Sequence, residues 1–424
     1  AYAGPCRLLS GGHCRLLKQR DYFLFLTSMN FPPRNISGLP EPDKASAKHS
    51  EKLRIAIQQV ITESGGAIPF AEFMQLALYA PALGYYVAGQ RRFGAAGDFV
   101  TAPELGDVFG RCLARQLVQV FAGINGAADI LEFGAGSGRL AATLIRELAE
   151  LGALPERYLI LETSPDLQQR QQQTLAELVP EHMPRFSWLD GMPEQGFSGV
   201  VLANEVLDAM PVEMFAVNEQ GAAQQYLVSN GDEGLQWDTR PASGRLAEQI
   251  NRLPVPAAYS SDLIPAIEGW IAMLAEGLQQ GVVLLIDYGF PRHEYYHPQR
   301  NGGTLMCHYR HHSHGDPLSH VGIQDITAHV DFTAVAEAAV DAGLDVLGFT
   351  TQANFLLASG LAEILALQNT GDTAMTKQQL DLNREIQVLT SPAEMGELLK
   401  VMAIGKGFAE SLTGFTIRDM RGRL

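Results

Sequence analysis

The chain of 424 residues lacks long apolar runs and is poor in cysteine. No apolar run reaches the roughly 18 residues that a membrane-spanning helix needs, so we expect no transmembrane helix. The four cysteines are Cys6, Cys14, Cys112 and Cys307. They have neither paired metal-ligand spacing nor the density of a disulfide framework, which favours a reducing compartment and predicts no metal cluster.

Positive charge is also scarce. The 31 Lys and Arg residues are outnumbered by 47 Asp and Glu residues, which gives a formal net charge of -16 at pH 7. A surface of this charge repels the phosphate backbone of nucleic acids, so we expect no nucleic acid partner. Apolar residues make up 46% of the chain and charged residues 18%, as in an ordinary globular enzyme.

The first 28 residues are basic, unlike the rest of the chain. A single acid, Asp21, accompanies four cations: Arg7, Arg15, Lys18 and Arg20. Such a segment could be an organelle presequence, which would place the protein in the mitochondrial matrix. We favour a disordered extension or a non-native leader, because Met29 resembles a natural start; a bacterial protein would then be cytoplasmic. Residues 1–28 are therefore excluded from the fold prediction.

Short, continuously apolar segments dominate the middle of the chain. Continuous apolarity indicates strands that are covered on both faces, as in a parallel sheet. Leucines at helical spacing, from Leu140 to Leu151, separate the first two segments and complete a β-α-β unit. We therefore predict an α/β fold with a mostly parallel sheet and helices on both faces. The predicted strands are 129–133, 158–162, 199–203 and 282–287, with 344–352 and 399–407 as candidates to close the sheet.

The rest of the sequence is arranged around this core. Residues 29–125 form an N-terminal helical and lid region, which contains a loop dense in glycine and aromatic residues. The core spans residues 126–352 and carries an insertion at about 211–265, where alternating apolar residues and Asn/Gly turns predict hairpin strands. Residues 353–424 are expected to supply C-terminal helices and the closing strand.

Each of the four central strands ends in polar residues. Glu132 and Glu162 end the first two strands, Asn204 and Glu205 the third, and Asp287 the fourth. In a doubly wound sheet, ligands bind outside the carboxyl ends of the strands. Four polar strand ends at one edge therefore predict a ligand site there.

The segment "DILEFGAGSGRL" (129–140) places a glycine-rich turn at this edge. Gly134, Gly136 and Gly138 permit a tight turn and close approach of the backbone to a ligand, but Arg139 stands where a dinucleotide fingerprint needs its third glycine. Glu132, close before the turn, would repel a diphosphate and attract a cation. S-adenosylmethionine carries an ammonium and a sulfonium but no phosphate, so we predict this cofactor rather than NAD.

Two further acids have predicted cofactor contacts. Glu162 follows Gly138 by 24 residues, where a carboxylate can accept both hydrogen bonds of a ribose diol. Asp190 stands where a third strand should end and could meet the adenine amino group. An Asp before a Gly is also common in ordinary turns, so that alternative stays open.

Five segments in this order resemble the MidA family of S-adenosylmethionine-dependent methyltransferases: "GDFVTAPELGDVFG", "LEFGAGSGRLA", "NEVLDAMPVE", "LIDYG" and "QDITAHVDF". The resemblance extends over about residues 35–407. It implies a Rossmann-like class I methyltransferase fold, with a seven-stranded sheet, an N-terminal helical addition and inserted elements. The mitochondrial member of that family is an arginine methyltransferase needed for the assembly of respiratory complex I.

Methylation of arginine requires acids that orient a guanidinium, since this group stays protonated in proteins. "ANEVLDAMPV" offers Glu205 and Asp208, with Asn204 beside the expected position of the sulfonium. Helix caps would explain Asn204 and Asp208 but not a charge at Glu205 after a buried strand. We predict these three residues as catalytic.

Two weaker predictions concern other segments of the resemblance. His329 and Asp331 could form a base with its orienting acid, although Asp331 could equally cap a helix. The resemblance also implies that one loop folds over the cofactor, through Gly97, Asp98, Thr101 and Glu104. A capping box between Thr101 and Glu104 is the competing interpretation of that loop.

A histidine cluster, His308, His311, His312 and His314, lies close to Arg300 and Arg310 in the sequence. Its spacing matches no common metal site and methyl transfer needs no metal, so we interpret it as a polar loop at the substrate entrance.

The leading hypothesis is a protein arginine methyltransferase, whose substrate the resemblance implies to be a complex I subunit. Methylation of a small molecule or of another residue is an alternative. So is a non-catalytic assembly chaperone that binds S-adenosylmethionine. An NAD-dependent oxidoreductase is disfavoured by Glu132 and Arg139. The oligomeric state stays open, a homodimer included.

Overall fold

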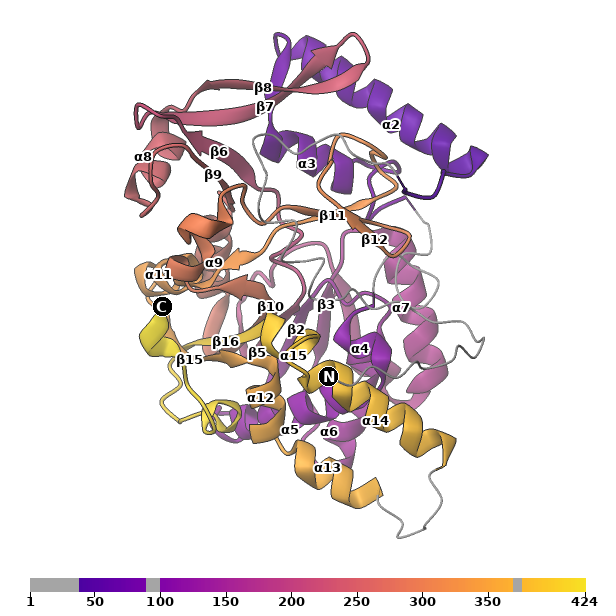
Figure 1. Ribbon diagram of the computed structural model, residues 1–424. Helices are drawn as coiled ribbons and strands as arrows, with labels where there is room; N and C mark the ends of the chain where they lie inside the picture. Colours follow the sequence, from indigo (N-terminus) through magenta and orange to yellow (C-terminus); the bar gives the residue numbers. More distant parts are fainter. Residues whose placement is uncertain (1–37, 89–99, 369–375) are drawn as a thin grey trace, which may run out of the picture.

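The protein is described by a computed structural model for residues 38–88, 100–368 and 376–424. Its central sheet has the strand order β15-β16-β10-β5-β2-β3-β4, and the short β14 (Val330–Asp331) pairs with β10 (Figure 1). The seven long strands are β2 (Asp129–Phe133), β3 (Tyr158–Leu161), β4 (Phe186–Leu189), β5 (Phe197–Asn204), β10 (Leu278–Phe290), β15 (Asp345–Thr351) and β16 (Leu399–Lys406).

The direction of the strands matches the prediction. β4, β3, β2, β5 and β10 are parallel neighbours, with Val201 paired to Leu131 on one side and to Val283 on the other. β16 is antiparallel to both β10 and β15, so β15 runs in the common direction. The mostly parallel sheet is confirmed, with β15 and β16 as its closing strands; β14 adds a short eighth strand to the seven long ones.

Both faces of the central sheet are covered, which explains the continuous apolarity of its strands. Successive side chains of a strand point to opposite faces, so Ile130 joins one apolar cluster and Leu131 the other. The first cluster includes residues of α5 (Val108–Ala122), α6 (Arg139–Glu150), α7 (Pro165–Leu178) and α12 (Gln352–Ala358). The second includes residues of α9 (Ile267–Gly277) and α11 (Phe332–Asp341).

A second, antiparallel sheet lies on the α9 side of the molecule. The insertion supplies four of its strands, β6 (Glu213–Val217), β7 (Ala223–Gly231), β8 (Gly234–Pro241) and β9 (Tyr259–Leu263). The fifth, β1 (Ala67–Pro69), comes from the N-terminal region and pairs with β7, a connection that the sequence did not predict. α2 (Lys44–Glu63) and α3 (Phe70–Tyr79) contact β7 and flank the sheet (Figure 1).

The remaining elements are a small sheet and further helices. A three-stranded sheet contains β11 (Met306–Tyr309), β12 (His312–His314) and β13 (Asp325–Thr327). The other α-helices are α4 (Ala102–Leu105), α8 (Gly244–Arg252), α10 (Arg292–Tyr295), α13 (Leu361–Gln368), α14 (Lys377–Thr390) and α15 (Met395–Leu398). Short 3-10 helices are η2 (Pro180–Arg185), η3 (Pro298–Arg300), η4 (Thr413–Phe415) and η5 (Arg421–Arg423). Within the described ranges, no helix combines the length and apolar character needed to cross a membrane.

Candidate active site

A cavity of about 610 Å³ lies at the carboxyl ends of β2, β3, β5 and β10. This volume lies within the range of small-molecule sites. One part of its wall comes from the segments 132–140 and 161–167, which are here called the glycine half. Another part, here called the acidic half, comes from the segment 204–209 together with Asp325, Tyr79 and Tyr86. The predicted ligand edge of the sheet is therefore a hollow with two chemically different sides.

The glycine turn of the glycine half has a backbone that needs glycine. Gly134, Gly136 and Gly138 have φ angles of 61°, 53° and 84°, in the left-handed region that other residues rarely adopt. A Cβ atom on Gly138 would stand 3.2 Å from the Cα of Gln171. The turn leads directly into α6 at Arg139. Because the three glycines have no side chains, a ligand can approach the backbone of the turn closely.

Glu132 is buried at the base of this half. Its carboxylate accepts a hydrogen bond of 2.8 Å from Tyr158 Oη. Burial, with a smaller contribution from the charge of Glu162, raises the pKa of Glu132 to about 7. A bound cation would favour the ionised carboxylate, whereas a phosphate would meet a repelling one. The geometry is thus compatible with the electrostatic selection predicted from the sequence.

Glu162 is held in place by two donors. The Ser164 amide donates to one carboxylate oxygen at 2.9 Å, and Gln171 Nε2 donates to the other at 3.1 Å. Gln171 Nε2 also reaches the Gly136 carbonyl at 3.2 Å, and its Oε1 accepts from Trp188 Nε1 at 2.9 Å. The fully buried Gln171 thereby connects the acid to the glycine turn, a role that the sequence did not predict.

Asp190 does not join the other predicted cofactor residues. It is exposed on the bend after β4 and is not among the residues that line the cavity. The structure therefore favours the ordinary turn that the Asp-Gly pair also allowed, rather than a contact with adenine.

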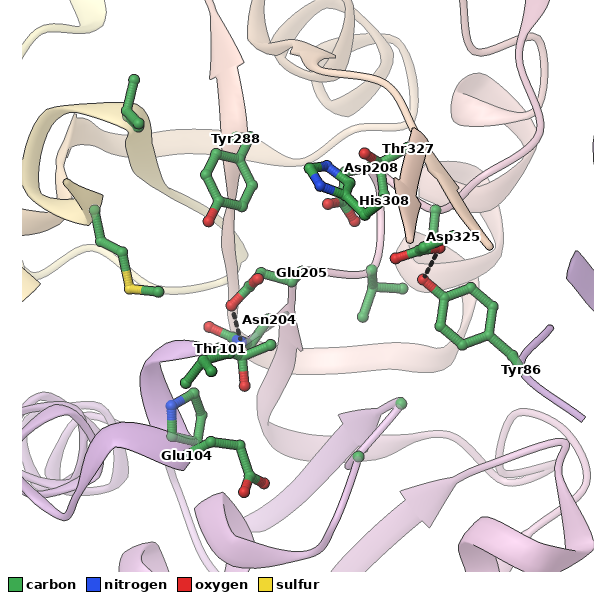
Figure 2. A pocket seen from close by; sticks show the side chains of 18 of the residues that line it. Tyr86, Thr101, Glu104, Asn204, Glu205, Asp208, Tyr288, His308, Asp325 and Thr327 are labelled. Atoms are coloured by element: carbon green, nitrogen blue, oxygen red, sulfur yellow. Dashed lines mark hydrogen bonds between the residues drawn. The ribbon is translucent and has the colours of Figure 1, made fainter. Parts of the chain in front are cut away.

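The short helix α4 lies between the two halves. Glu104 accepts a hydrogen bond from Ser137 Oγ of the glycine turn, and the Ala102 amide donates to Glu205. Thr101 precedes α4 without a side-chain cap hydrogen bond, so the capping box is not formed. Thr101 and Glu104 line the cavity instead (Figure 2).

Two further residues, Gly97 and Asp98, were predicted to belong to the lid. Gly97 and Asp98 lie outside the described residues.

The three predicted catalytic residues line the cavity together at the end of β5. Asn204 Nδ2 donates to Glu205 at 3.3 Å, the contact drawn in Figure 2. Glu205 has a φ angle of 52°, a strained value for a residue with a side chain. Burial and then the charge of Asp287 raise the pKa of Glu205 to about 8, and the same two causes raise the pKa of Asp208 well above its usual value.

Two acids to which the sequence analysis assigned no specific role complete this group. Asp287 accepts hydrogen bonds from the amides of residues 206–208 at 2.8–3.3 Å and so fixes the turn that carries the predicted acids. Asp325 lines the cavity and accepts a hydrogen bond of 2.8 Å from Tyr86 Oη (Figure 2). Both occur in segments of the family resemblance, "LIDYG" and "QDITAHVDF", and Asp287 also ends a predicted strand at the ligand edge.

The predicted His329–Asp331 pair has a different arrangement. His329 lines the cavity, but burial and the charges of Arg300 and Lys400 lower its pKa to about 3, which makes it a weak base. Asp331 is absent from the cavity wall, caps α11 through the Thr333 and Ala334 amides, and pairs with Arg292 at 3.0 Å. The helix cap was the alternative for Asp331, and the structure favours it.

The histidine cluster divides between the cavity and the surface. His308 and His311 are in the cavity wall, His312 is exposed, and His314 is buried in β12. The four histidines lie on the hairpin of β11 and β12, here called the small hairpin, and this placement is compatible with the predicted polar loop at a substrate entrance.

S-adenosylmethionine fits the chemistry of the glycine half. Glu132 and the glycine turn suit its cationic portion, and Glu162 suits a ribose diol. Asn204 Oδ1 and Arg139 Nε are buried without a hydrogen-bond partner in the described part of the chain, so the cavity has polar groups ready for a ligand. The sheet order and this site together define a class I methyltransferase with a nucleoside-bearing methyl donor.

Comparison with known proteins identifies the family. Residues 112–350 match the sequence profile of the family described as "Putative S-adenosyl-L-methionine-dependent methyltransferase". The match covers more than half of the chain, so the chain belongs to this family of S-adenosylmethionine-dependent methyltransferases. The family and the cofactor predicted from the sequence are confirmed.

Solved structures support the same assignment. A superfamily member from Burkholderia thailandensis, crystallised with S-adenosyl-homocysteine, is 42% identical, with a TM-score of 0.87. The match covers 91% of this chain and 100% of that one. A second structure from the same organism is 41% identical, with a TM-score of 0.84 and the same coverage.

Curated relatives have a more specific name. A Drosophila melanogaster protein named protein arginine methyltransferase NDUFAF7 homolog, mitochondrial, is 29% identical over 90% of this chain and 93% of its own length. A Danio rerio protein named protein arginine methyltransferase NDUFAF7, mitochondrial, is also 29% identical, over 80% of this chain and 83% of its own length.

Proposed function

We propose that this methyltransferase acts on an arginine of a protein substrate. The observation that carries the proposal is the acidic half, where Glu205, Asp208 and Asp325 line the cavity and Asp287 lies behind them. Their mutual repulsion and burial favour protonated carboxyls when no cation is present. A guanidinium supplies the missing positive charge and offers donors in a plane that carboxylates can hold bidentately.

The residues then have defined tasks. S-adenosylmethionine, when bound, supplies a methyl group on a sulfonium. Glu205 and Asp208 orient the guanidinium so that one nitrogen faces the glycine half, and a carboxylate of this pair accepts the proton that the methylated nitrogen loses. Asp325, held by Tyr86, adds negative charge to the same side. His329 has no proton-transfer task in this scheme.

The names of the relatives support arginine as the methylated residue. The family resemblance further supports a subunit of respiratory complex I as the substrate. The relatives are named mitochondrial, which supports a matrix location in a host with mitochondria; in a bacterial host the corresponding location is the cytoplasm.

The test is a methylation assay with capped arginine peptides from the complex I subunits of the host. Each peptide is incubated with the full chain and S-adenosylmethionine, and a matched set carries Lys in place of Arg. Mass spectrometry locates the added methyl group. We expect methylarginine, none with Asp208→Asn, and full activity with Asp341→Asn, an exposed acid outside the cavity wall.

Calorimetry with S-adenosyl-homocysteine checks that Asp208→Asn retains the cofactor site. Methyl transfer to lysine, or undiminished transfer by Asp208→Asn, would contradict the proposal. Binding of S-adenosyl-homocysteine without methylation of any arginine peptide would favour the non-catalytic chaperone.

A further inference from the structure

Arg139 is the only basic residue in the two segments of the glycine half. The other charged residues of these segments are the acids Glu132, Glu162 and Asp166, and Glu104 of α4 is hydrogen-bonded to the turn and lines the cavity as well. Acids alone would suit a ligand whose charge is only positive. One cation in the wall of this half therefore points to a ligand that also carries a negative group.

The position of Arg139 in the fold also favours an anion. Arg139 is the first residue of α6, a helix of 12 residues that has no acid in its first turn and no side-chain cap from Gly138. The Arg139 amide reaches Ser137 Oγ at 3.4 Å. Amides at the start of a helix carry partial positive charge and favour a negative group. A ligand carboxylate at this point would meet the start of α6 and the Arg139 side chain together.

The guanidinium of Arg139 has a donor available for such a ligand. Its Nε is buried without a hydrogen-bond partner among the described residues, and its side chain forms no ion pair with any of them. Burial raises the pKa of Glu385 and the charge of Arg139 opposes this shift, but Glu385 Oε1 already accepts the Val108 amide at 2.7 Å. A buried donor without a partner is costly, so it marks a place for an acceptor.

Another buried polar atom of the wall, Asn204 Oδ1, has the opposite character. It accepts no hydrogen bond in the described part of the chain, while Asn204 Nδ2 donates to Glu205. Phe133 of β2 pairs with Ala203 of β5, so Gly134 and Asn204 follow at adjacent strand ends. An unpaired acceptor suits an ammonium and an unpaired guanidinium N–H suits a carboxylate. An α-amino acid carries both groups, as the methionine part of S-adenosylmethionine does.

We propose that Arg139 binds the carboxylate of the methyl donor and thereby selects S-adenosylmethionine over its decarboxylated form. The decarboxylated form keeps the nucleoside, the sulfonium and an ammonium, so the acids of the cavity attract it at least as strongly. Arg139 reverses this order, because it pairs with the carboxylate where one is present and repels the purely cationic ligand where it is absent. The inference concerns the donor and does not depend on which residue is methylated.

The test compares S-adenosyl-homocysteine with the same thioether in which hydrogen replaces the carboxylate. Calorimetry measures the affinity of the full chain for each ligand, and neither measurement depends on turnover. The variants are Arg139→Gln, which removes the charge, and Arg139→Lys, which keeps the charge without the planar pair of donors. Arg252→Gln removes a charge from an exposed position of α8 and is the matched control.

We expect the unchanged chain to bind S-adenosyl-homocysteine about 10- to 100-fold more tightly than the decarboxylated ligand, as a hydrogen bond between charged groups gives. Arg139→Gln should weaken binding of S-adenosyl-homocysteine only. It should bind the decarboxylated ligand as tightly as before or more tightly, because a repelling charge has gone. Arg139→Lys should retain part of the preference, and Arg252→Gln all of it.

A disturbed fold would weaken both ligands, so the opposite responses to Arg139→Gln separate a carboxylate contact from a structural role. Equal affinity for both ligands in the unchanged chain, or a preference that survives Arg139→Gln, would overturn the inference. So would a parallel loss of both ligands in Arg139→Gln and Arg139→Lys. Arg300, which also lines the cavity, provides the last comparison. Loss of the preference in Arg300→Gln with its retention in Arg139→Gln would assign the carboxylate to Arg300 instead.

Discussion

The glycine half and the acidic half of the cavity are assembled in different ways. The glycine half comes from one β-α-β unit, so that its turn, Glu132 and Glu162 are close in sequence. The acidic half joins distant segments, and the hydrogen bond between Tyr86 and Asp325 connects residues 239 positions apart. The geometry of the glycine half is therefore set within one β-α-β unit. The geometry of the acidic half depends on how the N-terminal region and the small hairpin pack against the central sheet.

The charges of the two halves differ as well. Glu132 and Glu162 have fixed donors in Tyr158, Ser164 and Gln171. In the acidic half, burial and the charges of Asp287 and Asp325 raise the pKa of both Glu205 and Asp208. These differences support our proposal that the glycine half binds hydroxyl and amino groups of the methyl donor and that the acidic half binds a cation.

The strongest test of this division is Glu205→Gln. Loss of one preorganised charge from a reaction site costs about 10²–10³ in rate. We expect kcat for peptide methylation to fall by that factor, because the amide neither attracts the guanidinium nor accepts its proton. Affinity for S-adenosyl-homocysteine, measured by calorimetry, should stay within about twofold.

Glu248→Gln is the matched control, because Glu248 is exposed on α8 and absent from the cavity wall. If Glu205→Gln weakened cofactor binding as strongly as it slowed methylation, the two halves would not be separable.

The converse change is Glu162→Gln in the glycine half. Hydrogen bonds to a charged group are worth about 1.5–3 kcal/mol, so the Kd for S-adenosyl-homocysteine should rise about 10- to 100-fold. At saturating donor, kcat should change only a few-fold, because the acidic half is intact. A fall in kcat with unchanged cofactor affinity would assign Glu162 to catalysis and contradict its ribose role.

The same contrast explains which features could be predicted from the sequence. The strands and the glycine turn depend on local patterns, namely continuous apolar runs and glycine spacing, and both were predicted. Gln171 could not be, because it lies within "QQRQQQ" (168–173) and only the packing of α7 against β4 distinguishes the buried glutamine.

Local patterns left two interpretations open at two acids. Asp190 follows a strand as a ligand residue would, but an Asp-Gly pair forms an exposed turn equally well. Asp331 lies two residues after His329, yet its carboxylate points to the α11 amides and Arg292. In both cases the side-chain direction depends on tertiary contacts that spacing does not encode.

A pH series provides a third, smaller contrast. The pKa of Glu205 is about 8 in the folded chain, above its ordinary value of 4.5, so folding favours the protonated carboxyl. This contribution to stability is complete below about pH 4.5 and is lost as the pH rises through 8. Between pH 6 and 8 the free energy of unfolding of the unliganded chain should fall by about 2 kcal/mol from this group.

Urea unfolding at each pH measures the effect. Glu205→Gln should reduce the slope, since an amide does not titrate. An arginine peptide should also bind more tightly at pH 8 than at pH 6, because binding favours the ionised acids. Suppose that the free energy of unfolding rose between pH 6 and 8 by the same amount in Glu205→Gln and in the unchanged chain. This result would argue against protonated carboxyls in the acidic half.

The smallest expected effect comes from Tyr86→Phe, which removes a single hydrogen bond from the acidic half. Tyr86 Oη donates to Asp325 at 2.8 Å, so the variant leaves a buried carboxylate with one donor fewer. A loss of about 1 kcal/mol corresponds to about a fivefold decrease in kcat/KM for an arginine peptide, without a change in cofactor affinity. Tyr226→Phe removes a hydroxyl that contacts Ser260 in the second sheet, outside the cavity wall, and should leave kcat/KM unchanged. Equal losses in both variants would mean that the second sheet affects the site through general stability, whereas a loss confined to Tyr86→Phe would show that a residue far away in the sequence tunes the acidic half directly.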